Sequence, residues 1–84
     1  MTTPPSPLLQ RFARVLRRAR EEKKYSVADL ARSSGLSHAM VEAMEAGRRA
    51  PTLAQLVMLS EALGCTADAL VAATTAASRG DKRR

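Results

Sequence analysis

The sequence predicts an all-α protein, a compact domain of five short helices. Apolar residues recur at three- and four-residue steps along most of the chain, which is the period of one face of an α-helix. Serine, threonine, glycine and proline stand between these stretches, at the positions where helices begin and end. No stretch alternates apolar and polar residues as a half-buried strand does. With 84 residues, the chain is long enough for one domain with a small core.

The first predicted helix begins after Pro7 and runs to about Lys23. Residues 1–7 contain three prolines, so they are predicted to be a flexible lead-in. Arginines occupy one side of this helix, and the other side is apolar. The apolar residues are Leu8, Phe12, Val15, Leu16 and Ala19.

The second and third helices are expected to be short and joined by a tight turn. Ser26 can cap the second helix, which runs to about Ser33, by accepting from the amide of Asp29. Gly35 permits a left-handed backbone turn, and Ser37 can cap a third helix over residues 38–46. The side chains predicted to be buried are those of Val27, Leu30, Ala31, Val41 and Met44.

Two further helices follow a loop over residues 48–51. Thr52 and Gln55 form a predicted capping box, Gly64 ends the fourth helix, and Thr66 can cap a fifth. The domain is predicted to span residues 8–73. Residues 74–84 lose the helical period and gain charge, which predicts a disordered basic tail. The inward face of the fourth helix is predicted to carry Leu53, Leu56, Val57 and Leu63, and the apolar residues of the fifth helix are Ala69, Leu70 and Val71.

The chain is basic, with 14 Lys and Arg against 8 Asp and Glu and a formal net charge of +6. The excess gathers before Tyr25 and in the tail. Such a distribution favours a polyanionic partner such as nucleic acid. The alternative is a solvated surface that keeps a small protein soluble.

The composition disfavours several other classes of function. One Cys and one His, Cys65 and His38, can form neither an internal disulfide nor a tetrahedral zinc site. His38 adjoins Ser37 with no evident acid to orient it as a catalytic triad requires, so we expect no enzyme and no cofactor. No apolar run approaches the roughly 18 residues that span a bilayer, and no cleavable signal is visible. These features predict a cytoplasmic protein that binds no membrane.

Two short helices joined by a turn with one glycine match the helix-turn-helix motif. Over residues 16–70, the sequence resembles the lambda-repressor-like domains of the XRE family of bacterial and phage regulators. This resemblance implies a lambda-repressor-like fold and a DNA-binding transcriptional regulator, with repression as its expected output. The resembling residues are Arg20-Glu21-Glu22-Lys23, Tyr25-Ser26, Asp29-Leu30-Ala31, Gly35-Leu36-Ser37, Val41, Glu45, Gly47, Arg48, Pro51-Thr52-Leu53, Leu56, Leu59, Ala62-Leu63-Gly64 and Leu70.

The resemblance also implies roles for individual residues. Arg20 and Glu45 match two positions that often form an ion pair between the first helix and the end of the third. The positions that read bases correspond to Ser37, His38, Ala39, Glu42 and Ala43. The residues expected to contact phosphates are Arg17, Ser26, Arg48 and Arg49, although solvated surface residues are the alternative reading of these arginines.

The sequence departs from the family pattern at three places. Val27 replaces the usual glutamine at the start of the second helix, so this side chain cannot bind a phosphate. Lys24 replaces the usual glycine after the first helix. The outer face of the third helix has no Arg, Lys, Asn or Gln, the side chains best suited to contacts with guanine or adenine. This last departure puts sequence specificity in doubt.

We expect the protein to bind double-stranded DNA as a homodimer, because one reading helix buries too little surface for tight specific binding. The apolar residues assigned to an isologous dimer interface are Leu63, Ala67, Leu70 and Val71. The alternative is a protein-interaction module, such as an antitoxin or accessory regulator, whose partner is another protein. The scarcity of base-reading side chains supports that alternative, and the arginine-rich face opposes it.

Overall fold

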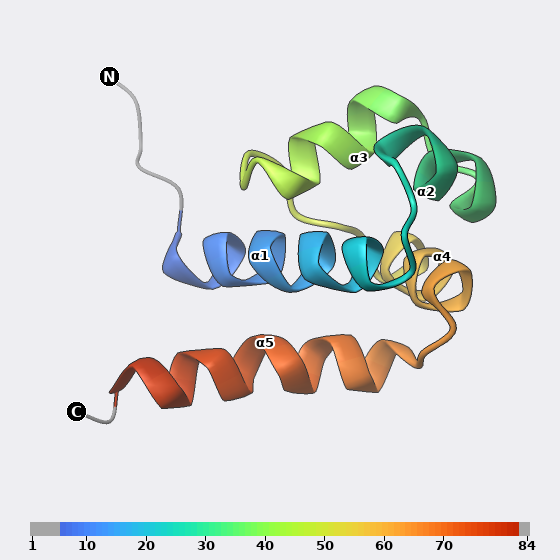
Figure 1. Ribbon diagram of the computed structural model, residues 1–84. Coiled ribbons are helices and arrows are strands. Elements are labelled where there is room, and N and C mark those ends of the chain that lie inside the picture. The colour runs from blue at the N-terminus through green and yellow to red at the C-terminus, as the bar shows by residue number, and fades with distance from the viewer. Residues whose placement is uncertain (1–5, 83–84) are drawn as a thin grey trace, which may run out of the picture.

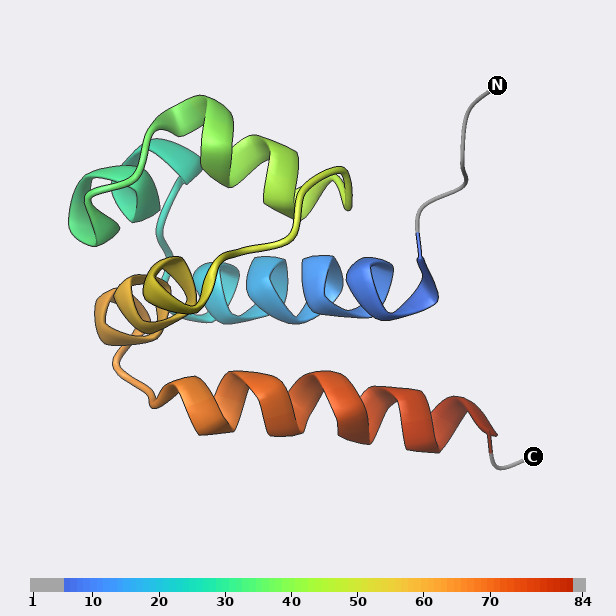
Figure 2. The same cartoon turned by 180° about the vertical axis from the view of Figure 1, so that it is seen from behind.

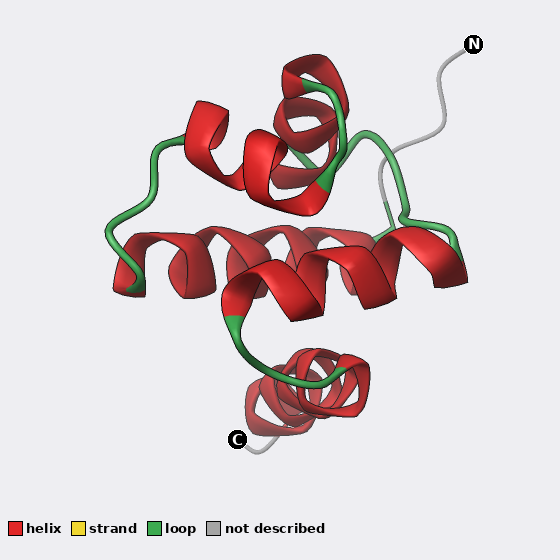
Figure 3. Cartoon of the chain, turned by 90° about the vertical axis from the view of Figure 1, so that its right-hand side faces the viewer, coloured by secondary structure: helices red, strands yellow, loops and turns green. Residues whose placement is uncertain are grey.

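The structure is a computed structural model that describes residues 6–82, with the backbone alone for residues 77–82. The helices are α1 (Pro7–Glu22), α2 (Val27–Ser34), α3 (His38–Glu45), α4 (Leu53–Leu63) and α5 (Ala67–Lys82). Figure 3 shows helices and loops but no strand in this part of the chain. The predicted all-α fold with five helices is therefore confirmed.

Helix α1 lies at the centre of the arrangement. In Figure 1 the α2–α3 pair is on one side of α1 and α5 is on the other, while α4 lies at one end of α1. Helix α1 packs against both α3 and α5, and α2 packs against both α3 and α4. Figure 2 shows the linker from α3 to α4 crossing α1. This order leaves α3 on the outside of the molecule, opposite α5.

The core is small and is shared by all the helices. Leu16, Leu30, Val41, Met44 and Leu59 are wholly buried, so each of α1 to α4 supplies at least one of them. Leu70 adds a buried side chain from α5. Burying one such side chain contributes about 1.5–3 kcal/mol to stability. The short helices α2 and α3 therefore hold their places through packing rather than through their own helix propensity.

Every helix begins at a serine or threonine cap. The side-chain oxygen accepts a hydrogen bond from the amide three residues later at 3.0–3.1 Å. Each cap of this kind contributes about 1 kcal/mol. Helix α1 starts at Pro7, one residue earlier than expected, because Ser6 is its cap. The caps are Ser6, Ser26, Ser37, Thr52 and Thr66.

The end of the chain differs from the predicted disordered tail over residues 74–84. Helix α5 continues to Lys82, and Thr74 is buried, with its Oγ1 donating to the Leu70 carbonyl oxygen at 2.9 Å. Packing along α1 supports this helix where its own apolar pattern is weak, because tertiary contacts add to local propensity. Residues 83–84 of the predicted tail and residues 1–5 of the predicted lead-in lie outside the described residues.

The inward face of α4 also differs from the prediction. Leu53 is 77% exposed and Val57 is 40% exposed, although both were expected to face the core. Leu59 and Leu63 are buried, and Leu56 packs against them. Leu53 is the first residue of α4 and projects beyond this small core, whereas Val57 lies about 100° around the helix from Leu56.

Among the described residues, no single helix has the length and apolar character needed to cross a membrane. The pair Leu53–Leu63 and Ala67–Ala76 meets that criterion only when taken together, and it is bent by 97°. The same residues contain no group of three or more His, Cys, Asp or Glu side chains that could hold a metal ion.

Candidate nucleic-acid interface

Helix α3 has one buried face and one exposed face. Val41 and Met44 are wholly buried against the core. His38, Ala39 and Glu42 are exposed, and Ala43 is half-buried at the edge of this face. An α-helix with its side chains is about 10–12 Å in diameter, so α3 fits the DNA major groove, which is about 12 Å wide. Four of the five candidate base-reading residues therefore share one accessible side of α3.

The turn before α3 presents the fifth candidate, Ser37. Gly35 adopts a left-handed conformation with φ of 79°, and its amide donates to the Ala31 carbonyl oxygen at 3.0 Å, which ends α2. The chain then reaches Ser37, whose Oγ accepts from the Met40 amide at 3.0 Å. Because this bond uses Oγ as an acceptor, the hydroxyl proton remains available to donate. No acidic residue lies in the first turn of α3, so the positive end of its dipole is not neutralised there.

His38 and Glu42 face each other on the outer side of α3. The His38 Nδ1 atom lies 3.7 Å from Glu42 Oε2, and both side chains are more than half exposed. A protonated His38 would therefore offset the negative charge of Glu42. The i, i+4 spacing of the two residues in the sequence was the available signal for this contact.

The end of α3 fixes the position of the two loop arginines. Gly47 has φ of 76°, which an L side chain rarely adopts, and its amide donates to the Met44 carbonyl oxygen at 3.1 Å. The Arg48 amide donates to the Ala43 carbonyl oxygen at 2.9 Å, so the backbone of Arg48 is tied to the last turn of α3. Arg48 and Arg49 are both exposed. Two guanidinium groups therefore follow the outer face of α3 directly.

Arg20 binds the end of α3 to α1, as the resemblance implied. Its Nε donates to Glu45 Oε2 at 2.7 Å, and its Nη2 donates to Glu45 Oε1 at 2.9 Å. A third bond, from Nη1 to the Tyr25 carbonyl oxygen at 2.8 Å, was not foreseen, because a backbone acceptor leaves no mark in the sequence. The hydrogen bonds that Arg20 donates to Glu45 raise the pKa of Arg20 above its usual value, although burial acts in the opposite direction. Arg20 thus joins α1, the α1–α2 linker and α3.

The other two candidate phosphate contacts already have partners within the chain. Arg17 Nε lies 3.4 Å from Glu21 Oε2, with both side chains exposed. Ser26 caps α2 through its Oγ, and its amide donates to Asp29 Oδ2 at 2.9 Å. The hydrogen bonds from Ser26, with the nearby Arg32, lower the pKa of Asp29. Both candidates remain exposed.

The predicted dimer residues do not form one exposed patch. Leu63 and Leu70 are only 8% and 3% exposed, because this small protein needs them for its own core. Ala67 is half-buried and Val71 is about half exposed. The large apolar residues that are exposed in the described part of the chain are Leu8, Leu53, Val57 and Val71.

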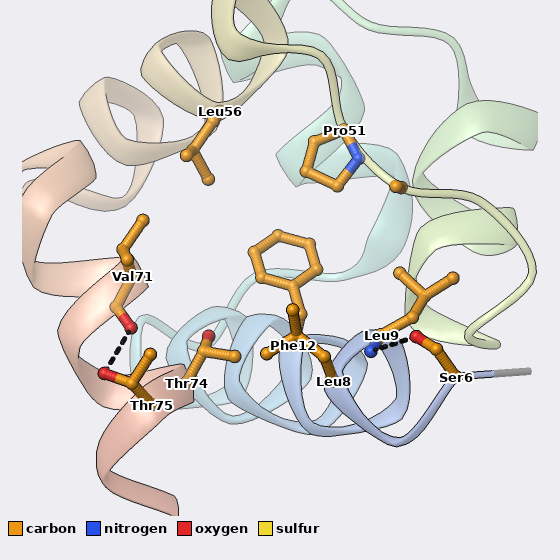
Figure 4. A pocket seen from close by; sticks show the side chains of 10 residues that line it. Ser6, Leu8, Leu9, Phe12, Pro51, Leu56, Val71, Thr74 and Thr75 are labelled. Atoms are coloured by element: carbon orange, nitrogen blue, oxygen red, sulfur yellow. Dashed lines mark hydrogen bonds between the residues drawn. The ribbon is translucent and has the colours of Figure 1, made fainter. Parts of the chain in front are cut away.

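Two of these exposed residues, Leu8 and Val71, border an open apolar groove of about 310 Å³. Figure 4 shows the groove, with Phe12 from α1 and Leu56 from α4 also pointing into it. Residues 50–78, which supply α4 and most of α5, contain no Lys or Arg and only two acidic residues. On its α4 and α5 side, the groove is thus bordered by a stretch of the chain without basic residues.

The sequence pattern of the helix-turn-helix family matches residues 16–70, which include α2, the Gly35 turn and α3. The chain belongs to the helix-turn-helix family. Within that family it is of the XRE type, whose members are DNA-binding transcription regulators. Among curated proteins, none matches the chain at a significant level.

Solved structures of helix-turn-helix regulators share this fold. The restriction-modification controller protein C.AhdI from Aeromonas hydrophila is 34% identical, with a TM-score of 0.72 over 74% of this chain and 94% of that chain. A hypothetical transcription factor, NHTF from Neisseria, is 30% identical, with a TM-score of 0.73 over 84% and 82%. The clp gene regulator ClgR from Corynebacterium glutamicum is 23% identical, with a TM-score of 0.79 over 93% and 88%, and shows similarity of fold alone.

Proposed function

We propose that this protein is a transcriptional regulator, with repression as its output, that binds double-stranded DNA as a homodimer in the cytoplasm. Helix α3 enters the major groove of each half-site. The observation that carries this proposal is the division of α3 into a face anchored by Val41 and Met44 and a free outer face. The family to which the chain belongs supports the same conclusion.

Phosphate contacts position α3 on the duplex. Arg48 and Arg49 extend from a backbone tied to the last turn of α3, and a guanidinium group suits the geometry of phosphate oxygens. At the other end of α3, the exposed amides of the first turn and the Ser37 hydroxyl donate toward a second phosphate. The two ends of α3 therefore carry the anchoring contacts, and Arg17 and Ser26 extend them along the backbone.

Base recognition rests on few side chains. His38 donates to a guanine acceptor, and Glu42 accepts from the amino group of cytosine. Because His38 Nδ1 lies 3.7 Å from Glu42 Oε2, the two side chains together read neighbouring base pairs. Ala39 and Ala43 contact thymine methyl groups. We therefore expect a short recognition sequence in each half-site.

The dimer forms through exposed apolar residues of α1, α4 and α5, with the groove bordered by Leu8 and Val71 at the centre and Leu53 and Val57 of α4 as further contacts. A stable interface buries about 800 Å² on each partner, and an apolar face without basic residues lets two positively charged protomers approach each other. This interface replaces the predicted one, which included the buried residues Leu63 and Leu70. Two half-sites about 34 Å apart would then face the two copies of α3.

The proposal is tested by measuring the affinity for duplex DNA at several salt concentrations. A protein that neutralises phosphates loses affinity linearly on a logarithmic scale, with a slope close to −0.9 for each contact. The double variant Arg48→Ala/Arg49→Ala should weaken binding to all sequences alike and reduce the slope by about 2. The double variant Arg17→Ala/Ser26→Ala measures the contribution of the more distant contacts.

The second candidate is a protein-interaction module, favoured by the absence of Arg, Lys, Asn and Gln from the outer face of α3. Affinity for DNA that does not depend on salt, together with a stable complex that uses the outer face of α3, would replace our proposal with this one.

A further inference from the structure

A second groove is lined by residues of α1 and α5. Helix α5 lies on the side of α1 opposite α3 in Figure 1. The volume of the groove is about 550 Å³, and only residues of α1 and α5 line it. The groove is separate from both the outer face of α3 and the apolar groove described above. Nothing in the proposed DNA complex uses it.

Three arginines line the α1 side of this groove. Arg11, Arg14 and Arg18 are spaced at three and four residues, so they form one ridge about 10 Å long on α1. In the part of the chain whose side chains are described, none of the three forms an ion pair, whereas Arg17 and Arg20 of the same helix each contact a carboxylate.

Arg11 has a side-chain nitrogen that lacks a hydrogen-bond acceptor among the described residues. This atom, Nε, is buried. A buried charged donor without an acceptor is unfavourable, so a rotation of the partly buried Arg11 side chain that brings Nε to a carboxylate in the groove would remove that penalty. The ridge therefore favours an anionic ligand.

The floor of the groove is apolar, and the side chains that form it are short. Ala73 and Ala76 of α5 lie across from Val15 and Ala19 of α1, and these short side chains leave room for another element to approach closely. Packed helices are 8–10 Å apart when such residues meet. Glu22 lies at the opposite end of the groove from Arg11, which gives the groove a positive end and a negative end.

We propose that this groove binds an acidic amphipathic helix of a partner protein. Carboxylates three and four residues apart on that helix pair with Arg11, Arg14 and Arg18, and its apolar stripe rests on the alanine floor. A protein helix fits better than nucleic acid, because a phosphate backbone has no apolar stripe to place on that floor. The acidic end of the helix lies toward Arg11, since Glu22 repels it.

The test uses the full chain and a defined probe. The probe is a synthetic peptide of about 18 residues, long enough to form a helix, with three glutamates at this spacing beside a leucine stripe. A scrambled peptide of the same composition, with the glutamates distributed around the helix, is the matched control. Calorimetry gives the dissociation constant, and NMR amide shifts locate the bound peptide. We expect shifts at Val15, Ala19, Ala73 and Ala76, and binding at least 10-fold weaker for the scrambled peptide.

Two variants test separately how the charge and the shape of the groove contribute to peptide binding. The triple variant Arg11→Gln/Arg14→Gln/Arg18→Gln should weaken peptide binding at least 10-fold. The variant Ala76→Leu, at an exposed position, should do the same by filling the floor while every charge remains. The matched control Arg17→Gln/Lys24→Gln/Arg32→Gln removes equal charge elsewhere and should change the affinity less than 3-fold.

Each contrary result overturns the proposal. Equal affinity for the two peptides would show that the groove does not recognise the helix. A loss of peptide affinity of less than 10-fold in either groove variant would show the same. Amide shifts centred on α3 would place the peptide on the DNA-binding face. A loss of duplex binding by the triple variant as large as that of Arg48→Ala/Arg49→Ala would assign the ridge to nucleic acid instead.

Discussion

The guanidinium group of Arg20 meets the carboxylate of Glu45 in two hydrogen bonds, 2.7 Å from Nε to Oε2 and 2.9 Å from Nη2 to Oε1. The two side chains are only 12% and 10% exposed. The pair joins the last turn of α1 to the last residue of α3, directly before the loop that carries Arg48 and Arg49. The orientation of α3 therefore depends on a contact that itself cannot touch DNA.

Replacing one partner of this pair should be strongly destabilising. Arg20→Ala should lower the free energy of unfolding by about 3 kcal/mol, because it leaves the Glu45 carboxylate nearly buried without a partner. Urea denaturation measures the change. The control Arg17→Ala, which breaks an exposed pair, should cost less than about 1 kcal/mol, and Glu45→Gln in the Arg20→Ala background should recover part of the loss. Equal costs for Arg20→Ala and Arg17→Ala would mean that the buried pair does not stabilise the fold.

Substitutions on the outer face of α3 should alter which bases are preferred. His38→Ala and Glu42→Ala should each remove about 1–3 kcal/mol of discrimination at one position of the half-site. Selection of bound fragments from a random duplex library measures this preference. Because His38 and Glu42 are in contact, the double variant should deviate from the sum of the single variants. An unchanged preference in both single variants would remove these residues from base recognition.

Negative charges introduced at the exposed apolar residues of the proposed interface should dissociate the dimer. Val57→Glu with Val71→Glu places two carboxylates at exposed positions, where they disrupt the interface without entering the core. Light scattering should then report a monomer, and affinity for a two-half-site duplex should fall to that of a single site. Ala39→Glu, on the outer face of α3, is the control and should leave the dimer intact while weakening DNA binding. A dimer that persists in the double variant would locate the interface elsewhere.

Replacing Lys24 by glycine should relieve backbone strain at this position. Lys24 has φ of 62°, and a left-handed conformation costs an L residue about 1–2 kcal/mol. Glycine removes this strain but gives the unfolded chain more freedom, so Lys24→Gly should stabilise the protein by about 0.5–1 kcal/mol. Thermal unfolding followed by circular dichroism measures the change. Lys23→Gly, at a right-handed position, should instead destabilise the protein, and a loss of stability in both variants would show that Lys24 is not strained.

The capping box of α2 should make stability dependent on pH in the acidic range. The hydrogen bonds from Ser26 lower the pKa of Asp29 in the folded state. The stabilisation is therefore complete above the unfolded pKa of about 3.9 and is lost as the pH falls through the lower folded value. Asp29→Asn should be least stable relative to the wild type above pH 5 (about one unit above that value), and the difference should shrink toward pH 2. Urea denaturation across this range tests the effect, with Asp68→Asn as the control. A difference that does not vary with pH would contradict it.

The helices and the starting points of α2 to α5 could be predicted from the sequence, because each depends on residues close together in the chain. Ser26, Ser37 and Thr52 cap amides three residues away, and the three- and four-residue apolar steps mark the buried faces. The candidate face of α3 follows from the same period. The resemblance to the XRE family added the Arg20–Glu45 pair, whose members are 25 positions apart.

The surfaces available to partners were decided by the tertiary structure. Leu53 and Leu63 are alike in the sequence, yet one is exposed and the other is buried, because a core of this size cannot cover every apolar residue. Residues 74–84 were predicted to be disordered, but α5 continues to Lys82 and Thr74 is buried, because α5 packs against α1. The groove lined by Arg11, Arg14 and Arg18 likewise exists only because α5 packs along α1. Local sequence fixes which segments become helices, whereas the packing of distant segments determines which side chains remain accessible.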